Sequence, residues 1–408
     1  RRLMYTISDE NHQKLEARLS GLKAERDLWA STWQELADYY LPRRYVWLDS
    51  SSARPSRSIR NPLILDGTGT IAARILAAGM MNGITSPARP WFRLRISGFE
   101  DDLNSAERIW LDEVQRRMLL VLAESNFYNA IAVLYLDLVI FGTAAMIMYE
   151  DHESVIRCYN PALGEYFVGQ SPRLEVNAFG REFTYRVGQL VQMFGKENLS
   201  DSSRSLAEQG GSGLSKEVKV THLIQPNLGD GYTKKHFGFT ECYWETGAPK
   251  GKLLRETGFY EFPAIVARWE LTANDSYGSS PAMDALGDVK QLQQETMEKG
   301  KSLSLMNTPP MLADIQLQHK PSAFMPRGIT YVAGLTNGAV GAKPAWEVNP
   351  PIAAMTMDLQ DIRGRIREFF NNDLFQMISQ LDTVRTATEI DARREEKLIR
   401  LGSVLERF

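Results

Sequence analysis

The sequence predicts an α+β protein on three observations. Apolar residues recur at helical spacing near the amino terminus, short alternating runs fill the stretch 143–270, and helical patterns return after Ser280. The chain has 408 residues, more than one hydrophobic core usually spans, and 43% of them are hydrophobic, which suits a folded protein. We therefore expect more than one structural unit.

The first predicted element is a long helix that ends at Leu41-Pro42. Its apolar side chains fall three or four residues apart, as on one face of a helix: Leu15, Leu19, Leu22, Trp29, Trp33, Leu36 and Tyr40. A coiled coil is the alternative, but packing on the chain's own core is commoner.

A second helix is predicted after Asp66 and Thr68, whose side-chain oxygens can cap its start. Besides Ile71, Ile75 and Leu76, this helix consists largely of small residues such as alanine and glycine. The backbone of another segment can therefore approach it closely. Pro87 and Pro90 stop it. The alternating run Trp91–Ile96 predicts a strand.

Two more helices are predicted between 104 and 142. Asn104 and Glu107 have the spacing of a capping box, and the helix they begin is expected to face inward with Trp110, Val114, Met118 and Val121. Ser125 or Asn126 can cap the next helix, which ends at Gly142.

An antiparallel β region is expected from Thr143 to Glu270. Gly, Pro and Asn punctuate its alternating runs, which are Ala144–Tyr149, Val155–Tyr159, Glu182–Val187, Val218–Ile224, Phe237–Trp244 and Ala264–Trp269. Between two of the runs, Asn198–Glu217 is rich in Ser and Gly and predicts a flexible surface loop.

The pattern in the last third of the chain predicts a helix, a proline-rich insert, a second helix, a polar loop and a third helix. Ser280 caps and Pro281 opens a helix to about Ser304. Met306–Pro351 holds seven of the eighteen prolines, so we expect loops and short strands such as Ile329–Val332. Three segments follow: the helix Ile352–Phe370, the polar interruption Asn371–Thr383, and a charged helix from Thr386 to about Leu405.

The motifs of catalysis and ligand binding are missing from the sequence. No G-x-x-x-x-G-K-[ST] loop for a nucleotide is present, the five histidines are scattered, and Cys158 and Cys242 lack CxxC spacing. We therefore expect no catalytic residue, no metal and no cofactor. A net charge of −3 argues against tight, nonspecific DNA binding, and the apolar runs are too short to span a membrane.

Several motifs together resemble one known family. They are Leu65–Arg95, Ser125–Asn129 with Phe141–Ala144, Arg181-Glu182-Phe183, Arg268-Trp269, Ser280–Leu286 and Arg385–Ile390. This series resembles the portal, or head-to-tail connector, proteins of short-tailed, T7-like bacteriophages. No single motif is decisive, but their order and spacing along most of the chain make the match specific.

The resemblance implies a portal fold with five kinds of segment. They are a wing over 1–280, stem helices over 281–305 and 352–370, a clip over 306–351, a tunnel loop over 371–384, and a helix over 385–408 that leads to a crown. The chain begins without Met and stops at Phe408, where such proteins carry further helices. We therefore expect a trimmed chain.

The resemblance also implies a function without catalysis. Portal proteins form a ring, a dodecamer by resemblance, at one vertex of the capsid, and double-stranded DNA passes through it during packaging and ejection. The implied partners are further copies of the chain, the terminase large subunit, tail adaptors, the major capsid protein and a scaffold protein. The implied location is the virion, after assembly in the cytoplasm of the bacterial host.

Three groups of residues are candidates for these contacts. The tunnel loop would face DNA with neutral side chains that allow sliding, namely Asn371, Asn372, Gln376, Ser379 and Gln380. Arg363, Arg365 and Arg367 would either touch phosphates or pair with acids of the next subunit. The clip would meet its partners through Ile315, Phe324, Met325, Tyr331 and Trp346.

Two other classes of protein are alternatives. A capsid protein or tail adaptor is another virion structural protein, but the order helix, clip, helix and loop argues against it. A packaging nuclease or ATPase would need a carboxylate metal cluster or a phosphate-binding loop, and neither is visible.

Overall fold

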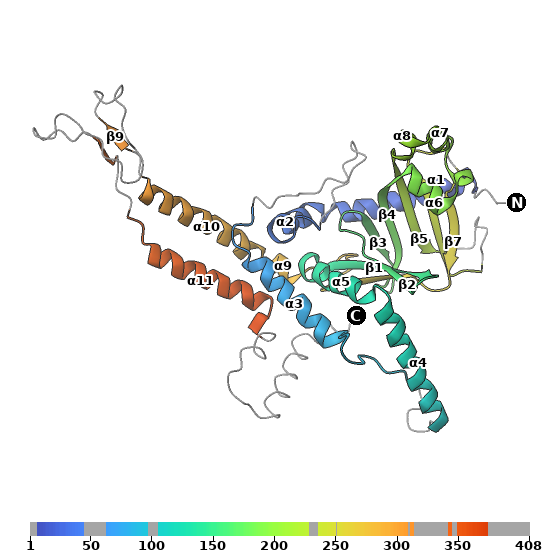
Figure 1. Ribbon diagram of the computed structural model, residues 1–408, viewed down its shortest axis with the longest axis horizontal. Helices are drawn as coiled ribbons and strands as arrows, with labels where there is room; N and C mark the ends of the chain where they lie inside the picture. Colours follow the sequence, from blue (N-terminus) through green and yellow to red (C-terminus); the bar gives the residue numbers. More distant parts are fainter. Residues whose placement is uncertain are drawn as a thin grey trace, which may run out of the picture. The chain divides into compact units, whose positions relative to one another are not determined.

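The computed structural model describes residues 6–44, 63–96, 105–227, 236–249, 251–308, 311–313, 342–344 and 349–373. The chain divides into two compact units. We call Gly287–Arg365 the hairpin unit and the remainder the body. Helices and antiparallel sheets alternate along the chain (Figure 1), so the predicted α+β class is confirmed.

The amino-terminal helix of the body is broken in two. α1 (Asp9–Asp27) begins at Ser8, whose hydroxyl oxygen accepts a hydrogen bond from the Asn11 N–H at 3.2 Å. α2 (Ala30–Tyr40) follows after a turn at Leu28, which is exposed. The prediction of one continuous helix is therefore wrong. The apolar face predicted for that helix is nevertheless buried, except at Trp29.

The small residues of α3 (Thr68–Ile84) are used inside the body. Ala72, Ala73 and Ala77 are buried, and α3 packs against α5 (Phe127–Phe141). α5 is buried along most of its length and ends at Gly142, where the sequence predicted its end.

Gly142 allows the close crossing that follows α5. Its φ is +74°, and a Cβ built there would lie 2.1 Å from the carbonyl oxygen of Gly278. No side chain fits at that distance, so this residue has to be glycine.

α4 (Ser105–Glu124) contradicts the predicted burial of its apolar stripe. Trp110 and Met118 are 63% and 44% exposed, and Leu111 is the buried residue of this helix. The 3–4 spacing correctly predicted a helix with an apolar face, but Trp110 and Met118 on that face are not buried by the described residues of the body.

Two antiparallel sheets form the centre of the body. The first has the strand order β2-β1-β8 and the second β3-β4-β5-β6-β7. The strands are β1 (Thr143–Asp151), β2 (Val155–Tyr159), β3 (Tyr166–Gln170), β4 (Val176–Arg186), β5 (Glu217–Pro226), β6 (Phe239–Glu245), β7 (Arg255–Phe259) and β8 (Ala264–Arg268). All six predicted runs are strands, β3 and β7 were missed, and Trp91–Ile96 is not paired in a sheet.

The predicted loop 198–217 is mostly helical instead. α6 (Val187–Phe194) and the short helix η1 (Lys196–Asn198) lead to α7 (Asp201–Gln209) and α8 (Gly211–Leu214). The Glu245 carboxylate on β6 accepts hydrogen bonds from the hydroxyls of Ser200 and Ser203 at the start of α7. Hydrogen bonds to a strand distant in sequence therefore stabilise a helix in a serine-rich segment whose composition predicts a loop.

Leucines of α1 cover one face of the larger sheet. Leu15, Leu19 and Leu22 pack in one cluster with Phe167 and Trp244. This packing explains why α1 keeps a regular apolar spacing although most of its other residues are charged or polar.

The hairpin unit consists mainly of two long helices. After α9 (Pro281–Asp284), capped by Ser280 as predicted, α10 (Leu286–Asn307) and α11 (Ile352–Phe369) follow the predicted helical patterns with a break at Ala285. The strands β9 (Met311–Ala313) and β10 (Ala342–Pro344) pair antiparallel. The strand predicted at Ile329–Val332 and the helix predicted from Thr386 lie outside the described residues.

In the described part of the chain, no single helix is long and apolar enough to cross a bilayer. The bent pair α4–α5 meets the criteria of length and composition together, with 75° between its two helices. Most of α5 is buried within the body, as expected of a core helix.

Candidate functional site

The two long helices of the hairpin unit are bonded to each other at two points along their length. The Lys299 ammonium donates a hydrogen bond to the Thr356 hydroxyl at 2.7 Å, and Nη2 of Arg365 donates to the Asp288 carboxylate at 3.0 Å. Residues early in α10 therefore meet residues late in α11. The helices are therefore antiparallel and form a hairpin.

Arg365 binds acids of its own chain. Besides Asp288, its Nη1 lies 3.2 Å from the carboxylate of Asp361, one helical turn away. The sequence left open whether this arginine meets phosphate or a neighbouring subunit, and the structure adds a third arrangement in which its charge is compensated within the hairpin. Arg363 is half-buried and Arg367 is exposed.

The predicted tunnel loop begins with a sharp turn in the body. Asn371 has a φ of +49°, a conformation that asparagine tolerates, and its N–H donates to the Glu368 carbonyl at 2.9 Å. Phe370 is buried and meets Tyr40 edge to face, whereas Phe369 is 41% exposed. Phe370 therefore packs into the body at the end of α11, and the adjacent Phe369 does not.

Asn372 does not fit the predicted contact with DNA. Its side chain is buried, with an exposed fraction of 1%, so it faces the protein interior in this structure. The other loop candidates Gln376, Ser379 and Gln380 lie outside the described residues. So do all the clip candidates, which are Ile315, Phe324, Met325, Tyr331 and Trp346.

A buried polar network in the larger sheet was missed by the sequence analysis. Arg181 on β4, His222 on β5 and Tyr243 on β6 are cross-strand neighbours. Nε of Arg181 donates to Nδ1 of His222 at 3.0 Å, and Nε2 of His222 lies 2.9 Å from the Glu241 carboxylate. A histidine inside an apolar strand was the available signal, but its partners come from other strands.

This arrangement fixes the charge states of the network. Burial lowers the pKa of His222 to about 4, so the ring is neutral at pH 7. Burial opposes ionisation of Glu241, but hydrogen bonds from His222 and Thr257 lower the pKa of its carboxyl to about 2. The neutral ring accepts from Arg181 and donates to Glu241, so each polar atom of the ring has a partner.

The network joins strands and contains no nucleophile bonded to the histidine. Tyr243 stacks on His222, with ring centroids 4.0 Å apart, and its hydroxyl donates to Glu241 at 3.0 Å. Within the residues that the structure describes, no group of three His, Cys, Asp or Glu side chains could hold a metal ion.

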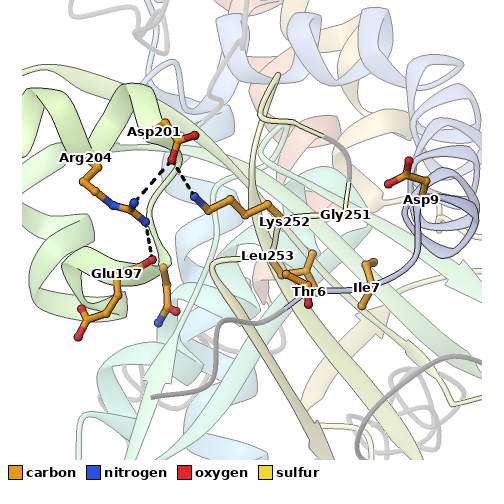
Figure 2. Close-up of a pocket in the computed structure, with 10 residues that line it drawn as sticks. Thr6, Ile7, Asp9, Glu197, Asp201, Arg204, Gly251, Lys252 and Leu253 are labelled. Carbon is orange, nitrogen blue, oxygen red and sulfur yellow. Dashed lines mark hydrogen bonds and ion pairs between the residues drawn. The ribbon is translucent and has the colours of Figure 1, made fainter. Parts of the chain in front are cut away.

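A surface hollow of about 390 Å³ lies between the start of α1, the start of α7 and the turn before β7. Figure 2 shows the Asp201 carboxylate between the side chains of Arg204 and Lys252, at 3.6 and 3.3 Å. Arg204 also donates to the carbonyl of Glu197 at 2.7 Å. The cations that line this hollow are bound by the chain itself, which leaves no converging charge for a ligand.

The described residues thus form an α+β body with a buried polar network in its larger sheet, and a hairpin of two long helices. The family model for "Bacteriophage head to tail connecting protein" matches residues 12–408. The chain is 39% identical to a probable portal protein of Bordetella phage BPP-1 and 40% identical to a portal protein of Salmonella phage epsilon15. Each match covers 98% of this chain and 72% of the relative.

The chain belongs to this head-to-tail connector family. Identity of about 40% over nearly its full length supports a portal role, and the resemblance predicted from the sequence is confirmed. The family is structural, and its description places its members between the head and the tail of the virion.

Proposed function

We propose that copies of this chain form a closed ring at one vertex of a phage capsid, with a dodecamer as the expected size. Double-stranded DNA passes through the ring during packaging and ejection. The ring is also the platform for the terminase large subunit, for tail adaptors and for the surrounding capsid protein. Its assembly takes place in the host cytoplasm.

The exposed apolar side chains of the hairpin unit carry this proposal. Val289, Leu292 and Leu359 are buried, but further toward the tip the side chains of Met297, Leu303, Leu305, Met306 and Met357 are 38–73% exposed. Two antiparallel helices form a single layer, so within the described residues of this unit the apolar surface has no second layer over it. Hairpins standing side by side in a ring would cover this surface.

The charges of the hairpin suit a channel in which DNA slides. A stem dense in free arginine would hold phosphates and slow passage, because each contact must break as the DNA moves. Arg365 is instead bound to Asp288 and Asp361. We assign the weak DNA contacts to Asn371, Gln376, Ser379 and Gln380, and leave out the buried Asn372.

The predicted clip is the docking surface for the motor and the tail in this proposal. Its apolar residues Ile315, Phe324, Met325, Tyr331 and Trp346 would bind these partners. The chain itself would hydrolyse no ATP and cut no DNA, since packaging energy comes from the terminase.

Electron microscopy of the purified chain tests the proposal. The expected result is a ring with a central hole, together with a mass of many subunits by light scattering. A stable monomer at micromolar concentration would overturn the ring. ATP turnover abolished by a point change in this chain would overturn the absence of catalysis.

A further inference from the structure

The chain passes twice between the body and the hairpin unit, and a glycine lies at each passage. The hairpin unit begins at Gly287, the second residue of α10, and ends at Arg365, directly after Gly364 in α11. Both passages run through a helix. The stiffness of these two helical segments therefore decides how freely the hairpin can move.

Packing does not require either glycine. Within the part of the chain that the structure describes, a Cβ built at Gly287 or Gly364 would meet nothing within 4 Å outside its own stretch of helix. Neither residue is among the glycines with a positive φ, in contrast to Gly142. Alanine would fit at both positions and favours a helix more strongly, so the effect of glycine here is to soften the helix.

The two glycines lie at the same level of the hairpin. The residues that follow them, Asp288 and Arg365, are joined by a hydrogen bond of 3.0 Å between carboxylate and guanidinium. A helix bonded to a stiff neighbour is splinted by it, but here both helices are softened side by side. They can therefore bend together, and the bond between Asp288 and Arg365 keeps the two bending points next to each other.

Gly300 in α10 provides the contrast. Its Cβ position is open as well, but the adjacent Lys299 is bonded to Thr356 of α11. The one glycine of α11 is Gly364, so α11 has no soft point at this level. A bend at Gly300 is therefore opposed by the neighbouring helix.

The helices are held on both sides of the two glycines. The helical run is interrupted at Ala285, between α9 and α10, two residues before Gly287. The side chains two residues before and after each glycine are fully buried, namely Ala285, Val289, Ile362 and Ile366. Bending is therefore confined to the turns that contain the glycines.

We propose that Gly287 and Gly364 form a paired hinge at the base of the hairpin, about which the hairpin swings as one piece relative to the body. The bonds Lys299–Thr356 and Arg365–Asp288 hold its two helices together during this motion. A hinge needs only a few residues that absorb the change in backbone angles. The inference goes beyond the proposed ring, because it concerns the movement within one copy of the chain.

Distances between spin labels, measured by double electron–electron resonance, test the hinge. One label is attached at Arg173→Cys in the body and one at Ala353→Cys in the hairpin, both exposed positions, and the two native cysteines are buried. A tagged chain with these two sites is co-expressed with an excess of the untagged natural chain and purified through the tag. Most assemblies then carry a single labelled copy, so each distance is measured within one copy.

The natural chain should give a broader distance distribution than a reference pair within the body, Arg173→Cys/Glu153→Cys. The double variant Gly287→Ala/Gly364→Ala should narrow the distribution toward that of the reference pair. Each single alanine variant should narrow it as well, because one stiffened helix splints the other. A natural chain as narrow as the reference, or equal widths in the natural chain and the double variant, would overturn the hinge.

Gly300→Ala is the matched control. It makes the same chemical change at an open position of the same helix, but inside the hairpin, so the distribution should stay broad. Narrowing equal to that of the double variant would show general stiffening of α10 and would overturn the paired hinge.

Hydrogen exchange gives a second readout. Gly287→Ala/Gly364→Ala should slow exchange of the amides around both positions about fourfold, as the difference in helix propensity between glycine and alanine implies. Unchanged exchange would contradict softening of the helices by glycine. A chain that stays monomeric would contradict the proposed ring, and the same two measurements would still decide the hinge.

Discussion

Replacing His222 with glutamine tests whether the buried ring between Arg181 and Glu241 is neutral. The glutamine carbonyl can accept from Arg181 and its amide can donate to Glu241, so His222→Gln keeps both hydrogen-bond roles without a titratable group. The variant should fold, and its stability should depend less on pH than that of the natural chain.

The magnitude follows from the pKa of His222, which burial lowers from 6.5 to about 4. As the pH falls, the unfolded chain binds a proton at this histidine before the folded chain does. The stability of the folded state is therefore highest above pH 6.5 and falls as the pH drops toward 4. Between pH 7 and pH 5 the unfolded chain takes up about 0.7 proton at this residue, whereas the folded chain takes up only about 0.1. The loss over that interval is about 2 kcal/mol.

Hydrogen exchange of the β5 amides, corrected for intrinsic rates, measures this loss in the assembled protein. The natural chain should lose about 2 kcal/mol more protection than His222→Gln between pH 7 and pH 5. His152→Gln, which removes an exposed histidine in the turn between β1 and β2, should behave like the natural chain. An equal loss in the natural chain and His222→Gln would refute the neutral ring.

Three other perturbations test separate parts of the molecule. Gly142→Ala should destabilise the body by about 2 kcal/mol or more, seen as a lower melting temperature, because its φ is +74° and the new Cβ would meet the Gly278 carbonyl; an unchanged melting temperature would contradict this. Changing Gln376, Ser379 and Gln380 together to Lys should slow DNA packaging at low salt and less so at high salt, with ring assembly checked by microscopy; an unchanged velocity would exclude the loop from the DNA path. Deleting Gln316–Met325 should leave the body folded, by circular dichroism, but block tail attachment, and intact attachment would show that the clip is misassigned.

Local patterns predicted those features that depend on neighbours in sequence. The spacing of Leu15, Leu19 and Leu22 identified a buried helix face, and the alternating runs identified six strands. The same spacing at Trp110 and Met118 correctly predicted a helix, but the prediction that these two side chains are buried was wrong. Periodicity shows that a helix has an apolar face, but not whether the folded chain buries that face.

Features that depend on distant partners could not be predicted. Glu245 bonds Ser200 and Ser203 from another strand, so a serine-rich segment becomes helical. The pairing of Arg181 with His222 depends on the register between β4 and β5, which no local pattern encodes. The start of the predicted tunnel loop likewise depends on packing, since Phe370 is buried and the adjacent Phe369 is not.

The two bonds across the hairpin have a mechanical consequence. Lys299–Thr356 and Arg365–Asp288 lie about 15 Å apart along the helices, as the rise of 1.5 Å per residue requires. Sliding α10 past α11 by one turn, about 5.4 Å, would break both bonds at once. The hairpin therefore resists shear between its helices, and an axial load applied to one helix is shared by the other.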